Sequence, residues 1–237
     1  GVGKSTLSPF IRDVFRERGL KAETICLDDF ITSYDSRQQM AKRHAGNPFY
    51  QIYRAMPGTH RVSDLMRVLE SIKAGKGFEI PIFDKSLKNG WGDVSKETRK
   101  VNGRQDLVIF EGWFLGVPNV TSKEFQDACI KNGVNLRAID PKLKYHKVLV
   151  SNLPEYQRLW RFLDYLVMMK PRDKSLHHKW RYQAEIKKAG DFARTEEEVS
   201  RYVDVFMPLT YVVYEKAKPD VLLMVDRDHR FFDRVEF

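Results

Sequence analysis

The sequence predicts an α/β fold, with a mostly parallel sheet and helices on both of its faces. Short apolar runs of strand length lie at 23–27, 107–110, 165–169 and 221–225. Apolar residues at helical spacing occupy the segments between these runs, and acidic residues directly follow three of the runs. Because apolar strands that alternate with helices are typical of a parallel sheet, we assign the chain to this class.

The composition is that of one globular domain. A chain of 237 residues, 42% of them hydrophobic, can bury a sizeable core, and it shows neither a repeat nor a linker. Its two cysteines, Cys26 and Cys129, have no metal-site spacing, which favours a reducing compartment and no disulfide framework. No apolar run is long enough to span a membrane. We therefore expect a cytoplasmic domain over 1–237, with any organelle-targeting segment lying before residue 1.

The net charge of +9 leaves two kinds of anionic partner open. Basic residues are scattered, without a run of five or six, so a solvated surface with one anion site is the preferred interpretation. Nucleic-acid binding is the alternative, and it predicts salt-dependent binding to DNA or RNA.

Residues 1–6, GVGKST, match the end of the phosphate-binding motif G-x-x-x-x-G-K-[ST]. In that motif Gly3 would let backbone N–H groups approach phosphate, Lys4 would reach the β- and γ-phosphates, and Ser5 would place its hydroxyl on Mg²⁺. A helix whose positive N-terminal end faces the same anion is predicted from the apolar spacing of Leu7, Ile11, Val14 and Phe15.

The first glycine of the motif, and the strand that leads into it, would lie before residue 1. We therefore expect the first strand of the fold in a longer, functional protein. Without that strand the phosphate loop lacks backbone donors and a sheet edge that holds it, so these 237 residues alone are expected to bind ATP poorly.

The segment between the first two predicted strands is less regular. The first helix is expected to end at Gly19, and residues 31–60 predict one or two short helices and a loop. Ser63 and Asp64 are expected to cap an amphipathic helix. Residues 78–104 predict a strand fragment followed by a long loop, 82–100, which is rich in glycine and lysine.

Further helices are predicted after the strand at 107–110. Apolar spacing predicts helices over 121–133 and 155–163, and residues 176–190 form a basic helical stretch. Thr195 and Glu198 have the spacing of a capping box, so another helix is expected to begin there.

Acidic residues at strand ends are the candidate catalytic groups. Asp28 and Asp29 follow the first predicted strand, and Glu111 follows the second. Ligands of open α/β sheets bind beyond the carboxyl ends of the strands. Phosphoryl transfer to a hydroxyl requires a phosphate cradle, a metal ion, a carboxylate for the acceptor and cations. Residues 1–6, these acids and the basic segment 172–188 supply candidates for all four.

Six segments, in order along the chain, resemble the plant-type D-glycerate 3-kinase family: GVGKST, LDDF, YRAMPGTH, PIFDKSLKNGWGD, VIFEGWFLG and KWRYQAE. These are P-loop kinases related to uridine kinase and phosphoribulokinase. The resemblance implies ATP and Mg²⁺ as cofactors and phosphorylation of a hydroxyl of a small molecule, D-glycerate to 3-phosphoglycerate. It also implies an acceptor-binding insertion over about 31–104 and a lid over about 171–192.

The resemblance implies a role for each matching residue. The catalytic candidates are Asp28, as the base, with Lys4, Glu111 and Arg181. The nucleotide-binding candidates are Gly1, Gly3, Lys4, Ser5, Thr6, Lys179 and Arg181. The metal-binding candidates are Ser5, Asp28 and Glu111. The acceptor-binding candidates are Asp29, Tyr53, Arg54, His60, Asp84 and Lys85.

A carboxylate acceptor requires a cation in its pocket, for which Arg54, His60 and Lys85 are the candidates. A hydrogen-bonded loop histidine is the alternative for His60, and a solvated lysine for Lys85.

The predicted acceptor wall departs from the family pattern at four positions. Ala55 replaces a glycine, Arg61 an aspartate, and Trp91 and Val94 two arginines. Another small hydroxylated acid, a sugar or a nucleoside is therefore an alternative acceptor, and a nucleotide-binding relative without catalysis is an alternative function. The oligomeric state and the preferred nucleotide base stay open.

Overall fold

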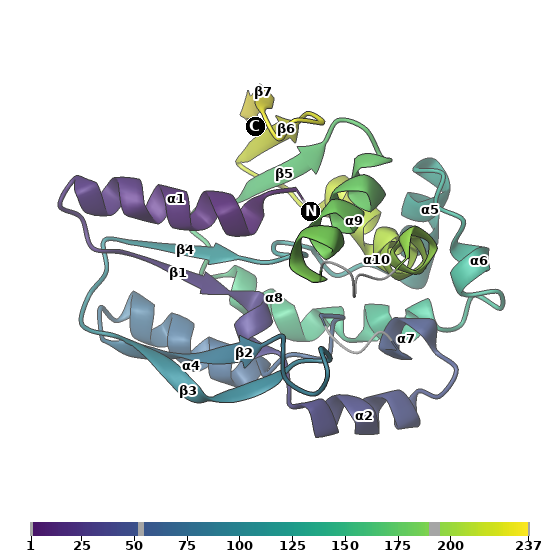
Figure 1. Cartoon of the computed structure of the whole chain (residues 1–237), viewed down its shortest axis with the longest axis horizontal. Helices are drawn as coiled ribbons and strands as arrows, with labels where there is room; N and C mark the ends of the chain where they lie inside the picture. The colour runs from purple at the N-terminus through teal and green to yellow at the C-terminus, as the bar shows by residue number, and fades with distance from the viewer. Residues whose placement is uncertain (1, 52–54, 190–194, 237) are drawn as a thin grey trace.

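The computed structural model describes residues 2–51, 55–189 and 195–236 (Figure 1). Two parallel strand pairs confirm the predicted α/β class: β1 (Ala22–Cys26) with β4 (Leu107–Glu111), and β5 (Val167–Pro171) with β6 (Val221–Val225). β7 (Phe231–Glu236), which the sequence did not predict, pairs antiparallel with β6. β5 begins two residues after the predicted start at 165.

The pairing of β1 with β4 brings the predicted catalytic acids to one edge. The register joins Ala22 to Leu107 and Cys26 to Glu111. The chain leaves β1 through a short 3₁₀ helix, η1 (Leu27–Phe30), which carries Asp28 and Asp29. The carboxyl ends of both strands therefore meet at the same place.

The parallel strands form two separate pairs, whereas the sequence predicted one sheet. In the described ranges, β4 and β5 each leave one edge unpaired. A cavity of about 1390 Å³ lies between them, and every residue of β4 lines it. Apolar side chains of α1 (Lys4–Glu17) and α10 (Glu196–Lys216) line it as well, including Leu7, Ile11, Phe206 and Met207. Among the described residues, the cavity therefore has unpaired strand edges on two sides and apolar helix side chains around it, which is the environment that a further parallel strand would need.

Helix α1 begins and ends at the glycines that the sequence indicated. Gly3 precedes it with a φ of 103°, and Gly19 follows it with a φ of 81°. Both values lie in the left-handed region that favours glycine. Figure 1 shows α1 lying along β1 and β4, and the helix contacts both strands.

The long loop predicted over 82–100 is wrong. β2 (Phe78–Asp84) and β3 (Asp93–Val101) form an antiparallel hairpin there. Most β3 side chains are partly or fully exposed, so the strand has no apolar run to reveal it. Arg37, buried on α2 (Tyr34–Arg43), donates to the carbonyl groups of Trp91 and Gly92 and holds the turn of the hairpin.

The predicted cap of the next helix is also wrong. α4 (Val62–Lys73) begins before Ser63, and Arg61 is its N-cap residue without a side-chain cap. The backbone N–H of Arg61 donates to the carbonyl of Phe30 at 2.6 Å, so a tertiary contact sets the start of the helix. By contrast, the capping box of Thr195 and Glu198 at the start of α10 is confirmed.

The remaining helical elements surround these strands. The helix expected over 155–163 is a 3₁₀ turn followed by one short helix, and the other expected helices are present. The bounds are α2 (Tyr34–Arg43), α3 (Pro48–Gln51), α5 (Ser122–Lys131), α6 (Leu136–Ile139), α7 (His146–Ser151), η2 (Leu153–Tyr156), α8 (Gln157–Trp160) and α9 (Leu176–Ala189). Among the described residues, none of the helices combines the length and the apolar character that crossing a bilayer requires.

Candidate functional site

The N-terminal end of α1 has the properties of an anion site. The carbonyl of Gly3 accepts the N–H groups of Thr6 at 3.0 Å and Leu7 at 2.9 Å, which starts the helix directly after the glycine. No side chain caps this end, and no acidic residue lies in the first turn. The positive end of the helix dipole is therefore open to a negative ligand beside Lys4.

Two of the three predicted metal-binding residues contact each other directly. The hydroxyl of Ser5 donates to Oε1 of Glu111 at 2.7 Å. Ser5 stands in the first turn of α1, and Glu111 is the last residue of β4. The contact fixes the start of α1 against the carboxyl end of the strand.

Asp28 lies at the same edge and is paired with a cation. Nζ of Lys85, in the turn after β2, donates to Oδ2 of Asp28 at 2.8 Å. Burial raises the pKa of Asp28, but the charge and hydrogen bond of Lys85 and the charge of Lys4 outweigh it, so the pKa lies below its ordinary value. Asp28 is therefore ionised at neutral pH.

Asp29, its neighbour, has the opposite environment. Burial raises the pKa of Asp29 above its ordinary value, although the backbone N–H of Phe83 donates to the carboxylate. The negative charge of Asp28 adds to this rise. The pKa values of the two adjacent acids are therefore shifted in opposite directions, and Asp28 is the one whose carboxylate form is stabilised.

Of the residues predicted to bind the acceptor, only some can supply a positive charge to the site. His60 is buried, and burial lowers its pKa to about 4, so His60 is neutral and is not the predicted cation. Asp84 accepts hydrogen bonds from the backbone and hydroxyl of Ser86 and forms a local turn. Lys85 is the cation that the structure brings to the site. Tyr53 and Arg54 lie outside the described residues.

The backbone at Ala55 has a conformation that suits the glycine of the family pattern better than an alanine. Its φ of 72° is a left-handed conformation, which costs an L-residue energy and which glycine adopts freely. We expect Ala55→Gly to raise the free energy of unfolding by about 0.5–1 kcal/mol, measured by chemical denaturation. Ala74→Gly, at a φ of −77°, is the matched control and is expected to lower it. Equal effects of the two substitutions would contradict strain at Ala55.

Helix α9 carries two predicted nucleotide-binding residues, Lys179 and Arg181, and one of them lines the same cavity. Arg181 lines the cavity, donates to Glu185 at 3.2 Å and lies over the ring of Tyr202, 5.3 Å from its centroid. Lys179 is exposed and is not among the described residues that line the cavity. Thr6 is also exposed, and Gly1 lies outside the described residues.

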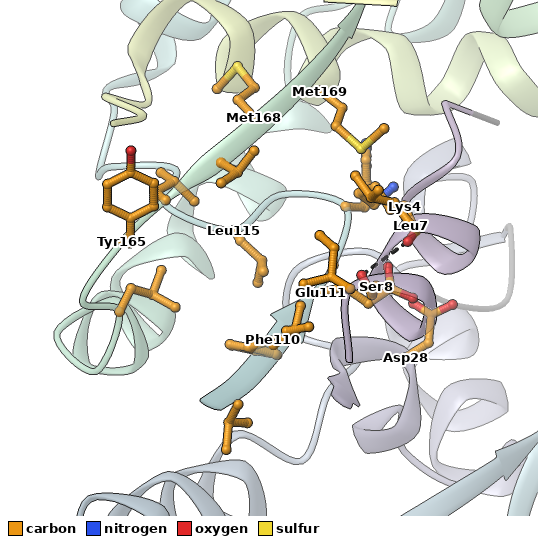
Figure 2. Close-up of a pocket in the computed structure, with 18 of the residues that line it drawn as sticks. Lys4, Leu7, Ser8, Asp28, Phe110, Glu111, Leu115, Tyr165, Met168 and Met169 are labelled. Atoms are coloured by element: carbon orange, nitrogen blue, oxygen red, sulfur yellow. Dashed lines mark hydrogen bonds between the residues drawn. The ribbon is translucent and has the colours of Figure 1, made fainter. Parts of the chain in front are cut away.

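The cavity joins these groups into one site with two different ends. Figure 2 shows Lys4, Glu111 and Asp28 gathered near the start of α1, whereas the apolar side chains of Leu115 and Met168 line the cavity farther from that point. The polar end suits a phosphorylated ligand. The apolar part lies along the edges of β4 and β5 that are unpaired in the described part of the chain.

Tyr156 is a buried residue that contacts His60 and that was not among the predicted site residues. Its hydroxyl lies 2.8 Å from Nδ1 of His60, across 96 residues of sequence. In the sequence it looks like any aromatic residue on an apolar helical face, so no local signal could have identified it.

Comparison with known proteins identifies the family. No protein-family model matches the chain. The protein named "Uncharacterized kinase mug58" from Schizosaccharomyces pombe is 31% identical over 223 residues, which cover 90% of this chain and 77% of that protein. Proteins named D-glycerate 3-kinase, from Arabidopsis thaliana and Cryptococcus neoformans var. grubii, match the chain as well. The chain belongs to this family of kinases.

Other members of the D-glycerate 3-kinase family are named for their reaction. The chloroplastic D-glycerate 3-kinase of Arabidopsis thaliana is 28% identical over 96% of this chain, which spans about half (50%) of that relative. The structure of D-glycerate 3-kinase from Cryptococcus neoformans var. grubii is 26% identical and has a TM-score of 0.88, over 99% of this chain and 87% of that one. Phosphoribulokinase from Rhodobacter spheroides, at 14% identity and a TM-score of 0.54 over 94% and 66% of the chains, shares the fold alone.

Proposed function

We propose that the protein transfers the γ-phosphoryl group of ATP to a hydroxyl of a small hydroxylated acid, most simply D-glycerate to 3-phosphoglycerate. The observation that carries this proposal is the convergence of the open end of α1, the Ser5–Glu111 contact and the ionised Asp28 at one end of one cavity. The names of the Arabidopsis and Cryptococcus relatives support the choice of acceptor.

In this proposal the phosphates of ATP bind at the start of α1. Backbone N–H groups of the first turn and the ammonium of Lys4 neutralise the phosphate charge. Arg181, which now donates to Glu185, would exchange that partner for phosphate as the proposed lid over 171–192 closes. Part of this segment, 190–192, lies outside the described residues.

The donor set at Ser5 and Glu111 fits Mg²⁺. In the described ranges no group of three or more His, Cys, Asp or Glu side chains could hold a metal ion. Mg²⁺ with ATP needs no such cage, because it takes one or two protein oxygens and completes its shell with waters and phosphates. When bound, the ion would neutralise phosphate charge, and Ser5 and Glu111 are the residues that would hold it.

Asp28 is the proposed base for the acceptor hydroxyl. As a carboxylate it orients the hydroxyl and accepts its proton as the bond to phosphorus forms. Lys85 keeps Asp28 ionised and supplies a positive charge for an acceptor carboxylate. We propose that the segment 31–104 forms the acceptor wall, that no nucleic acid or membrane is a partner, and that the protein works in the cytoplasm.

The proposal is tested by ADP production with D-glycerate and a panel of other small acids, sugars and nucleosides. We expect turnover that requires both ATP and one acceptor, with D-glycerate the best. Calorimetric ATP binding without turnover on any acceptor would instead support a nucleotide-binding relative without catalysis.

Removing Lys85 should shift the pH dependence of the reaction. The carboxylate of Asp28 is the active form, so activity falls as the pH falls through its pKa. Lys85→Met removes the interaction that lowers this pKa, so the acidic limb of kcat/KM is expected to move to higher pH. Lys88→Met, in the same turn and over the ring of Tyr34, is the matched control. An unmoved acidic limb in the Lys85 variant would contradict the role of Asp28.

A further inference from the structure

The ring of His60 is buried beside the proposed base. The backbone of His60 forms an isolated antiparallel bridge with Ile31, the residue directly after η1. Only 6% of the surface of His60 is exposed. Phe114 and Tyr156 pack against the ring, each with a centroid distance of 5.7 Å. Burial lowers the pKa of His60, and the negative charge of Asp28 opposes that fall. Among the described residues, Asp28 is the charged group that the ring senses.

Hydrogen bonding at Tyr156 decides where the proton of His60 lies. The backbone N–H of Gly58 donates to the hydroxyl oxygen of Tyr156 at 2.9 Å. Burial raises the pKa of Tyr156, and donation by the backbone N–H groups of Gly58 and His60 opposes that rise. The oxygen is therefore already an acceptor, and its own hydrogen needs an acceptor. Nδ1 of His60, at 2.8 Å, is the one available in the described part of the chain.

These hydrogen bonds are compatible with one tautomer of the His60 ring. If Tyr156 donates to Nδ1, then the neutral His60 carries its proton on Nε2. Nε2 is buried and has no hydrogen-bond partner among the described residues. A buried N–H group without an acceptor costs about 1–3 kcal/mol, so such groups are rare and this one requires a partner.

We propose that Tyr156 is a positioning residue of the acceptor site: it holds His60 as the Nε2–H tautomer, which donates to an oxygen of the bound acceptor. The proposal rests on the proposed function, because the acceptor is its ligand. His60 thus contributes a neutral donor rather than a positive charge, while Lys85 supplies the charge.

A second set of contacts holds this arrangement rigid. The hydroxyl of Tyr50 donates to the carbonyl of Pro57 at 2.9 Å, and Nδ2 of Asn152 donates to Tyr50 at 2.8 Å. Gly58 has a φ of 91°, and a Cβ there would lie 2.8 Å from Cγ of Asn152. The segment before His60 is therefore fixed against η2 and its neighbours, which preorganises the donor.

The tautomer is tested directly in the wild-type protein by ¹⁵N NMR of the histidine rings, which needs no turnover. We expect His60 to show a protonated Nε2 and an unprotonated Nδ1, and the Nε2–H signal to shift on titration with D-glycerate. A protonated Nδ1, or a signal that D-glycerate leaves in place, would overturn the proposal. Absence of turnover with an intact Nε2–H response would contradict the proposed function alone.

Variants separate positioning from folding. His60→Gln keeps an N–H donor near the place of Nε2, whereas His60→Asn places it near Nδ1, so the Asn variant is expected to have the higher KM for the acceptor, by about fivefold for one hydrogen bond. Tyr156→Phe is expected to raise the same KM by about fivefold and to leave the KM for ATP unchanged. Equal changes in both KM values, or equal behaviour of the Gln and Asn variants, would show a merely structural role.

Discussion

Asp28→Asn is expected to reduce kcat by about 10²–10⁴-fold, the range typical of a lost general base. An amide keeps the size and the hydrogen-bonding capacity of the side chain, but it cannot accept the proton of the acceptor hydroxyl. ATP binding should change little, because Lys4 and the Ser5–Glu111 contact remain. The measurements are steady-state kinetics with the best acceptor and calorimetric titration with ATP.

The control for this substitution is Asp127→Asn, on the exposed face of α5, where the carboxylate bonds to Lys123. We expect its kcat to equal that of the wild type. A kcat within a factor of about three of the wild type for Asp28→Asn would exclude Asp28 as the base, since a general base contributes far more. A loss of ATP binding in that variant would instead place Asp28 among the groups that hold the nucleotide.

An apolar strand joined ahead of residue 1 is expected to pair with the open edges of β4 and β5 and to stabilise the protein. Ser5 contacts Glu111, the last residue of β4, so a strand that leads into α1 would end at the same edge and run parallel to β4. The lining of the cavity by α1 and α10 would cover both faces of such a strand. An apolar residue at every position therefore suits it.

The expected gain is several kcal/mol. Five buried aliphatic side chains contribute about 1.5–3 kcal/mol each, and ordering five residues costs about 1.5 kcal/mol each. A net gain of about 4 kcal/mol would raise Tm by roughly 8–16 °C for a chain of this size. ATP binding should tighten as well, because the added strand anchors the start of α1.

The experiment compares two N-terminal extensions of equal length, one of five valine and isoleucine residues and one that alternates serine and aspartate. Thermal unfolding and amide hydrogen exchange at β4 and β5 are the measurements. Greater protection and a higher Tm for the apolar extension alone are expected. Equal Tm values for both extensions would show that the cavity is not a strand site.

The elements that sequence predicted well are those with local causes. Helix α1 and its start after Gly3 follow from the glycine and the apolar spacing behind it, because backbone conformation and helical periodicity depend on neighbouring residues. The strand that ends at Glu111 was visible for the same reason, as was the capping box of Thr195. A strand fragment was predicted where β2 lies, but β3 and the hairpin were missed, because an exposed strand needs no apolar run.

The tertiary structure alone decided how these pieces form a site. Strand order and register bring Asp28 to the same edge as Glu111. The hairpin turn brings Lys85 to Asp28, which lowers the pKa of Asp28, whereas burial raises that of Asp29. Burial, not residue type, makes His60 neutral, and Tyr156 reaches it across 96 residues. Such contacts depend on packing between distant segments, so the sequence by itself determined the chemical groups, and the fold determined their charge and their partners.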